Sequence, residues 1–210
     1  MALSRLYFVT MDGAPMGPLE QIGEACRAGI RLIQLRMKEV SDQEFLQTAR
    51  EAMRICGAWG SRLIINDRVE VAAAVDADGV HVGREDMSVR EARQLLGEGK
   101  IVGGTANRLE DIREHYLGGA DYIGLGPYRY TTTKMKLSPI LGLEGYQQMM
   151  RALVADGMEI PVMAIGGIGL ADVGPLLEAG VYGVAFSGLL VQALDREGVV
   201  RILEEEIKTS

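Results

Sequence analysis

Short apolar runs alternate with stretches of helical periodicity along the whole chain. The first run covers residues 6–9, and Leu19, Ile22 and Cys26 then recur at the spacing of one helix face. Similar apolar runs predict strands at residues 6–9, 31–36, 62–65, 79–82, 101–104, 121–125, 161–165 and 181–186. Helical spacing predicts helices at 19–26, 41–56, 69–75, 88–96, 109–117, 143–154 and 170–179, and from 189 to the end.

Two of the predicted helices begin with a cap that the sequence shows directly. Ser41 is followed three residues later by Glu44, and Ser88 is followed in the same way by Glu91. This spacing is typical of a capping box, in which each side chain bonds the backbone amide of the other residue. The two serines therefore mark where the second and fourth helices begin.

Eight strands in strict alternation with helices predict parallel βαβ units, and eight units close a (β/α)₈ TIM barrel. The competing architecture is a doubly wound open sheet. It needs no eighth unit, and it usually carries a Gly-x-Gly-x-x-Gly turn after the first strand, which this sequence lacks. We therefore expect residues 1–210 to form a single TIM-barrel domain.

Polar residues follow the predicted strands at the ends where a barrel carries its active site. Gln34, Arg36 and Lys38 alternate along the second strand, so their side chains should point to the same side. A strand that is buried on both faces is normally apolar, so this arrangement favours a pocket for an anion. The alternative is a frayed strand end with its charges in water.

Asp67 and Asp86 follow two neighbouring predicted strands. Both carboxylates could reach one divalent ion, with phosphate oxygens and water completing an oxygen shell of the Mg²⁺ type. Asp86 could instead simply begin the next turn. The nearby cations Arg36 and Lys38 favour the metal site, because a Mg²⁺ diphosphate needs both signs of charge.

The stretch from Gly126 to Gly142 has neither helical nor strand periodicity. So long a connection in a compact domain is usually a lid or a binding loop. Its threonine hydroxyls and lysine, together with the glycines at its start, suit a phosphorylated ligand; these residues are Gly124, Gly126, Thr131, Thr132, Thr133 and Lys134. A variable surface loop is the alternative.

Two further turns match the place where barrels bind phosphate with backbone amides and a helix N-terminus. They are Gly166-Gly167 after the seventh strand and Ser187-Gly188 after the eighth. They indicate a phosphate without indicating a reaction.

The composition narrows the classes of partner. A net charge of −7 argues against a nucleic-acid surface, and no apolar run reaches the roughly 18 residues that span a bilayer. The start of the chain lacks the features of a signal peptide, so we expect a cytoplasmic protein without a membrane partner. Cys26 and Cys56 are expected to be buried thiols, and His81 and His115 to be structural residues with satisfied hydrogen bonds.

Taken in order, several motifs strongly resemble the thiamine-phosphate synthase family. They are Gln34-Leu-Arg-Met-Lys38, Ile65-Asn-Asp-Arg68, Gly79-Val-His-Val-Gly-Arg-Glu-Asp86, Gly124-Leu-Gly-Pro127, Thr131-Thr-Thr-Lys134 and Ala164-Ile-Gly-Gly-Ile168. The resemblance implies condensation of 4-amino-5-hydroxymethyl-2-methylpyrimidine diphosphate with a thiazole phosphate, giving thiamine phosphate and pyrophosphate, with Mg²⁺ as cofactor. A homo-oligomer is compatible with this reading.

The resemblance also implies a role for each matching residue. The pyrimidine diphosphate would be held by Gln34, Leu35, Arg36, Met37, Lys38, Asn66, Thr105 and Lys134. Of these, Arg36, Lys38, Thr105 and Lys134 are the expected catalytic residues. Asp67 and Asp86 would hold Mg²⁺, Thr131 to Thr133 would face the thiazole, and Gly166, Gly167, Phe186 and Ser187 would bind its phosphate.

Two positions depart from the family pattern, which usually has Ser at position 105 and Gln at position 84. Thr105 keeps the hydroxyl but adds a methyl group and stiffens χ1. Two other functions share much of the pattern: a thiazole tautomerase, which would not need the metal carboxylates, and a regulator that binds thiazole phosphate without turnover.

Overall fold

The computed structural model describes residues 3–130 and 139–209, and in them the predicted alternation of strands and helices is confirmed. The strands are β1 (Leu6–Val9), β2 (Leu32–Leu35), β3 (Arg62–Asn66), β4 (Gly79–Val82), β5 (Ile101–Ala106), β6 (Tyr122–Leu125), β7 (Val162–Ile165) and β8 (Gly183–Phe186). The helices are α1 (Pro18–Arg27), α2 (Asp42–Ala58), α3 (Val69–Ala74), α4 (Val89–Leu96), α5 (Leu109–Leu117), α6 (Gly142–Ala155), α7 (Leu170–Glu178), α8 (Gly188–Val191) and α9 (Arg196–Thr209).

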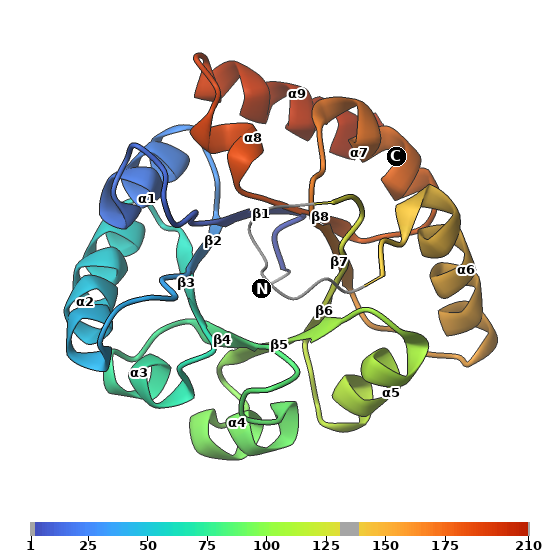
Figure 1. The fold of residues 1–210 in the computed structure, drawn as a ribbon, viewed down its shortest axis with the longest axis horizontal. Coiled ribbons are helices and arrows are strands. Elements are labelled where there is room, and N and C mark those ends of the chain that lie inside the picture. The colour runs from blue at the N-terminus through green and yellow to red at the C-terminus, as the bar shows by residue number, and fades with distance from the viewer. Residues whose placement is uncertain (1–2, 131–138, 210) are drawn as a thin grey trace.

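The strands form a closed parallel barrel in the order of the sequence, and β1 completes it by pairing with β8 (Figure 1). The helices surround the strands as an outer ring (Figure 1). The predicted (β/α)₈ barrel is therefore confirmed. Among the described residues, no helix is both long and apolar enough to cross a membrane.

Two cores result from the alternation of side chains along each strand. One lies between the strands and the helices and is mostly aliphatic. The other fills the barrel interior with residues from alternate positions, namely Tyr7, Leu32, Ile64, Tyr122, Met163 and Ala185. The same inward series continues toward the carboxyl ends of the strands, where it becomes polar.

The predicted capping box is complete at Ser88, and at Ser41 the structure shows the serine half of it. The side chain of Ser88 accepts from the Glu91 amide while Glu91 accepts from the Ser88 amide, which completes the capping box. At Ser41 the serine side chain accepts a hydrogen bond from the Glu44 amide at 3.2 Å.

The prediction of one helix from residue 189 to the end was wrong. α8 ends at Val191, and α9 begins at Arg196. The side chain of Asp195 accepts a hydrogen bond from the Gly198 amide at 2.9 Å, so Asp195 starts a new helix rather than continuing the first. Periodicity alone gave no sign of this break.

Candidate active site

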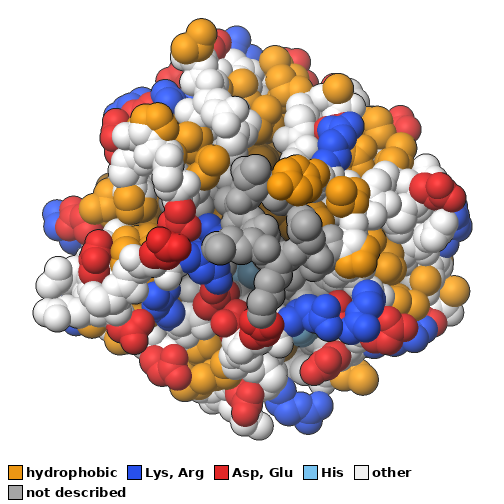
Figure 2. Space-filling view, in the orientation of Figure 1, with side chains coloured by type: hydrophobic (Ala, Val, Ile, Leu, Met, Phe, Trp, Pro, Cys, Tyr) orange, Lys and Arg blue, Asp and Glu red, His pale blue; other side chains and the backbone are white. Residues whose placement is uncertain are grey.

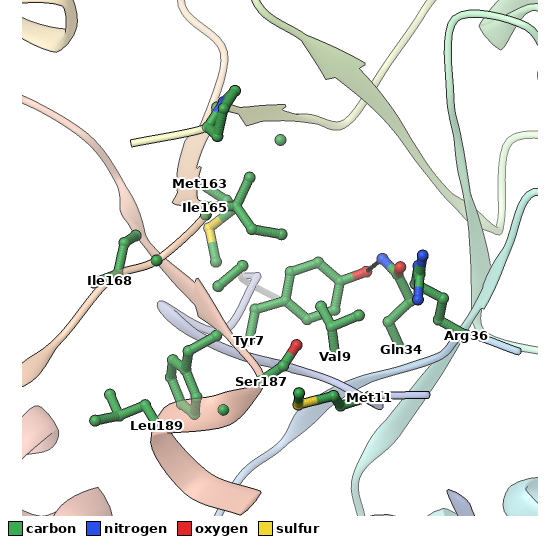
Figure 3. A pocket seen from close by; sticks show the side chains of 18 of the residues that line it. Tyr7, Val9, Met11, Gln34, Arg36, Met163, Ile165, Ile168, Ser187 and Leu189 are labelled. Atoms are coloured by element: carbon green, nitrogen blue, oxygen red, sulfur yellow. Dashed lines mark hydrogen bonds between the residues drawn. The ribbon is translucent and has the colours of Figure 1, made fainter. Parts of the chain in front are cut away.

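A cavity of about 610 Å³ opens at the carboxyl ends of the strands. It reaches down to inward-facing residues of the barrel core, such as Tyr7 and Met163 (Figure 3). On the face of the barrel seen in Figure 2, acidic and basic side chains lie close to the centre. Many residues predicted for the site line this cavity: Gln34, Arg36, Asn66, Thr105, Gly166, Gly167, Phe186 and Ser187.

Gln34 and Arg36 lie side by side at one edge of the cavity, as their alternation along the strand predicted (Figure 3). Gln34 is buried and donates through Nε2 to the hydroxyl of Tyr7 at 2.6 Å. Arg36 forms an ion pair with Asp12 at 2.7 Å. This side of the cavity therefore carries a positive charge and an amide whose orientation is fixed.

Lys38 is placed differently from the other two members of its series. β2 ends at Leu35, so the alternation no longer controls the direction of a side chain three residues further on. Lys38 is half exposed and forms an ion pair with Asp67. It thus belongs to the charged cluster beside the cavity.

Leu35 and Met37 point away from the cavity. Both side chains are buried in the core between the strands and the helices. Any contact of these two residues with a substrate would therefore come from the backbone, which agrees with their position opposite Gln34 and Arg36 in the alternation.

Asn66 brings an unused donor into the cavity wall. Its side chain is buried, and its Nδ2 has no hydrogen-bond partner among the described residues. A buried donor without a partner is costly, so its presence in a cavity wall favours a polar ligand at this point.

The carboxylates of Asp67 and Asp86 both lie close to Gly83. A Cβ atom at Gly83 would lie 2.7 Å from Asp86 Oδ2 and 3.9 Å from Asp67 Oδ1. Asp67 has a φ of 63°, which is rare for a residue with a side chain, and its turn follows β3 directly. The backbone is thus held in an unusual conformation that brings the two carboxylates together.

The charges of these carboxylates are strongly interdependent. Burial and the neighbouring Asp67 carboxylate raise the pKa of Asp86 above its ordinary value. Burial also opposes ionisation of Asp67, but the hydrogen bond from Lys38 outweighs it and lowers the pKa of Asp67. Two adjacent carboxylates of this kind fit a divalent cation, which would relieve their repulsion.

In the described part of the chain, no third carboxylate, histidine or cysteine joins Asp67 and Asp86 to make a full set of metal ligands. A Mg²⁺ ion bound here would take its remaining oxygens from water and from a substrate. This is the coordination typical of Mg²⁺ that carries a phosphorylated ligand.

The opposite side of the cavity is formed by the turns after β7 and β8. Gly166 and Gly167 have φ angles of 100° and 69°, a conformation that favours glycine. Ser187 and Gly188 lie beside them in the cavity lining, at the start of α8. The first amides of a helix have no acceptor within it, so they can bind phosphate oxygens.

Thr131, Thr132, Thr133 and Lys134 lie outside the described residues. The lid expected from Gly126 to Gly142 includes residues 131–138, which lie outside the described residues, and it stays a prediction. On the flanks of the stretch, Asn107 donates to the carbonyl oxygens of Gly126 and Pro139, both at 2.9 Å. The two ends of the loop are therefore fixed to the same side chain.

Arg84, for which the sequence offered no role, forms an ion pair with Asp111 at 3.7 Å. Asp111 also accepts from the backbone amides of Asn107 and Arg108 at 3.0 and 3.2 Å. The guanidinium of Arg84 is thus directed toward the start of α5.

Several residues of the cavity were missed by the sequence reasoning. They include Tyr7, Val9, Thr10, Met11, Arg129, Tyr130, Ile140 and Gln192. The inward alternation in β1 offered a usable indication for Tyr7 and Val9. Arg129 offered none, because it lies in a loop whose path the sequence does not reveal.

Both histidines and both cysteines have the structural environments that were expected. His81 and His115 are buried, and each forms hydrogen bonds with Thr105 or a tyrosine. Cys26 and Cys56 are buried free thiols.

Comparison with known proteins connects this geometry to a family. A model of the family described as thiamine monophosphate synthase matches residues 6–190. A thiamine-phosphate synthase from Bacteroides fragilis is 47% identical over 190 residues, which cover 90% of this chain and 93% of the relative. A thiamine-phosphate synthase from Flavobacterium johnsoniae is 40% identical and covers 97% of this chain and 96% of its own.

A solved structure agrees with these relatives. The thiamine phosphate pyrophosphorylase from Pyrococcus furiosus has 30% sequence identity and a TM-score of 0.84, covering 98% of this chain and 96% of its own.

Proposed function

The chain belongs to the thiamine monophosphate synthase family, and we propose that its cavity joins a pyrimidine diphosphate to a thiazole phosphate, releasing pyrophosphate and thiamine phosphate. The observation that carries this proposal is the division of one cavity into two unlike sides. The carboxyl ends of β2 to β4 carry Arg36, Asn66 and the neighbouring carboxylates, and the glycine turns follow β7 and β8. Two phosphorylated substrates would thus meet between two separate anchors.

The diphosphate belongs on the charged side. Arg36 contributes charge from the cavity wall, and Asn66 contributes an unused donor. Lys38 stands beside the carboxylate pair, and Lys134, outside the described residues, completes the proposed set of cations. Asp67 and Asp86 would hold Mg²⁺, which would supply positive charge to the departing pyrophosphate.

The thiazole phosphate belongs on the glycine side. Gly166 and Gly167 allow the backbone to approach an anion closely, and Ser187 adds a hydroxyl. Phe186 lies next to them in the lining. Thr131, Thr132 and Thr133 would face the thiazole ring from the part of the loop outside the described residues.

The bond-breaking step should be dissociative. Among the described residues of the cavity lining, there is no carboxylate or thiol that could attack the substrate. The C–O bond to the diphosphate would break with both electrons leaving on pyrophosphate. The resulting pyrimidine methylene cation, stabilised by the amino group of its ring, would then accept the lone pair of the thiazole nitrogen.

The protein's contribution in this scheme is electrostatic and positional. Arg36, Lys38 and Lys134 would stabilise the leaving anion, while the glycine turns hold the thiazole in place to capture the cation. The two relatives by sequence are named as thiamine-phosphate synthases and the solved structure as a thiamine phosphate pyrophosphorylase, which favours this reaction over a thiazole tautomerase or a non-catalytic regulator.

The direct test is incubation of the purified protein with pyrimidine diphosphate, thiazole phosphate and Mg²⁺. We expect thiamine phosphate and pyrophosphate in equal amounts, and neither product when one substrate is omitted. Isomerisation of a thiazole precursor without condensation would identify a tautomerase. Binding of thiazole phosphate with no product under any condition would indicate a regulator.

A further inference from the structure

Side chains from five different strands form one hydrogen-bonded chain across the floor of the cavity. Gln34 donates through Nε2 to the Tyr7 hydroxyl at 2.6 Å, and the hydroxyls of Tyr7 and Tyr122 lie 2.8 Å apart. The Tyr122 hydroxyl lies 3.0 Å from His81 Nδ1, and His81 Nε2 lies 2.8 Å from Thr105 Oγ1. Figure 3 shows the first of these bonds, between Gln34 and Tyr7.

With Gln34 as the donor of the first hydrogen bond, one direction along the chain gives every proton an acceptor. Tyr7 accepts from the amide of Gln34, and its own hydroxyl proton then has an acceptor within the chain only if it is donated to Tyr122. Tyr122 then gives its own proton to His81 Nδ1, which must be unprotonated. A neutral histidine with a bare Nδ1 carries its proton on Nε2, so His81 donates to Thr105 Oγ1.

We propose that this chain is proton-ordered and that His81 is a positioning residue, which holds Thr105 so that its hydroxyl donates into the cavity. The opposite end is ordered as well. Because the Nε2 of Gln34 faces Tyr7, its Oε1 is the atom left to accept from a ligand. Both ends of the chain line the cavity.

The chain can hold this order because its two tyrosines are buried and its rings pack against one another. Tyr7 and Tyr122 are both fully or almost fully buried, and burial raises the pKa of both, so both hydroxyls keep their protons at neutral pH. The His81 ring stacks on Tyr122 with a centroid distance of 5.5 Å, and Tyr7 meets Tyr122 edge to face at 5.7 Å.

Glycines make room for these rings. A Cβ at Gly124 would lie 2.9 Å from His81 Cε1, and one at Gly103 would lie 2.2 Å from the Tyr122 ring. Neither contact is sterically possible without movement of the ring. The strands on both sides are therefore built around one fixed arrangement of the histidine and the tyrosine.

The ordered chain therefore sets two hydrogen-bonding requirements on a ligand. It must offer a donor to Gln34 and an acceptor to Thr105, because the chain fixes both ends together. An aminopyrimidine diphosphate meets both requirements, since it has an amino group and several acceptor atoms. This specific ligand rests on the proposed function, whereas the order of the protons does not.

The order of the protons can be measured without substrate. The chain contains two histidines, so ¹⁵N-histidine labelling gives two ring systems, and a His115→Gln variant assigns them. We expect His81 to be neutral, with its proton on Nε2 and none on Nδ1. A Tyr122→Phe variant should populate the Nδ1–H form as well. A His81 proton on Nδ1 in the unaltered protein would overturn the proposal.

The positioning role is tested by a double-mutant cycle with Tyr122→Phe and Thr105→Val. Tyr122→Phe should lower kcat about tenfold, the effect of roughly one neutral hydrogen bond, and should leave the KM for thiazole phosphate unchanged. In the Thr105→Val background it should have no further effect on kcat, because His81 acts through the hydroxyl that is already lost. Independent, multiplicative losses would overturn the proposal.

Tyr146→Phe is the matched control. Tyr146 is also a buried tyrosine whose hydroxyl is bonded, in this case to the carbonyl oxygen of Leu125, but it is not part of the chain. Loss of the Tyr146 hydroxyl should lower the free energy of unfolding and leave kcat unchanged. A fall in kcat equal to that of Tyr122→Phe would mean that Tyr122 matters only for packing. If the protein makes no thiamine phosphate at all, the proposed function fails, while the tautomer measurement still decides the order of the protons.

Discussion

Lys38 donates a hydrogen bond directly to Asp67, so a cation expected to hold a diphosphate is already paired with a carboxylate expected to hold a metal ion. The pair lies beside the cavity that Arg36 enters. A ligand that brings both a divalent cation and phosphate oxygens could satisfy both groups at once. The ion pair therefore keeps each charge compensated while no ligand is bound.

We predict that Asp67→Asn and Asp86→Asn each lower kcat by on the order of 10²-fold or more and raise the Mg²⁺ concentration needed for half-maximal rate. Each change removes a charged oxygen from the proposed metal site. Initial rates measured across a Mg²⁺ titration check this. Asp156→Asn, which alters an exposed carboxylate paired with Arg113, should leave the titration unchanged. Ordinary rates at ordinary Mg²⁺ in both site variants would contradict the metal assignment.

The dissociative step predicts sensitivity to electron withdrawal in the pyrimidine. Replacing its 2-methyl group by trifluoromethyl destabilises a cation on the ring, so turnover should fall by orders of magnitude. Roughly 1.4 kcal/mol of added barrier corresponds to a factor of ten. Single-turnover rates with the two substrates are the measurement. An unchanged chemical step would support direct displacement by the thiazole nitrogen.

Arg129 offers a positive charge at the glycine side of the cavity. Its backbone amide donates to the carbonyl of Gly166 at 2.9 Å, and its guanidinium pairs with Asp172. We predict that Arg129→Gln raises the KM for thiazole phosphate about threefold to fivefold, as expected for ~1 kcal/mol from a solvent-exposed charge. The KM for pyrimidine diphosphate should not change.

The same substitution at Arg113 is the control for Arg129→Gln. Arg113 also pairs with an aspartate, but it is not part of the cavity lining. Arg113→Gln should alter neither KM. An equal rise in both KM values on Arg129→Gln would point to a general disturbance of the barrel rim.

Asp111 should make stability depend on pH. Burial disfavours its charge, but hydrogen bonds from the Asn107 and Arg108 amides outweigh this and lower its pKa. A lowered folded-state pKa contributes stability above the unfolded value of about 3.9, and this contribution is lost as pH falls through the folded value. Asp111→Asn should lower the free energy of unfolding by about 1–2 kcal/mol at pH 7. Urea unfolding of the unaltered protein and of Asp111→Asn should show that the difference in their free energies of unfolding becomes smaller below about pH 4.

The elements could be predicted from sequence because each has its own periodicity and several have their own caps. Ser88 and Glu91 show this most clearly, since the complete capping box begins α4 at the expected residue. The end of β5 was less visible. The strand continues through Thr105 to Ala106, beyond the glycines where an apolar pattern fades.

The candidate site was only partly accessible to the same reasoning. Alternation placed Gln34 and Arg36 correctly in the cavity wall, because they lie in or directly after β2. The direction of the Lys38 side chain could not be predicted in this way, because Lys38 lies three residues beyond the end of β2. The contact between Tyr7 and Tyr122 joins residues 115 positions apart, and no local pattern in either strand indicates the other.

The closure of the barrel has a consequence for synthesis on the ribosome. β1 takes β8 as its second neighbour, and Arg5 donates to the carbonyl oxygens of Tyr182 and Ile207 at 2.7 and 2.9 Å. The cavity is lined from both β1 and β8, so it cannot exist while residues 183–186 are still unmade. A nascent chain must keep this edge of β1 unpaired until residues 183–186 have been made, and substrates can protect only a polypeptide that includes them from misfolding or degradation.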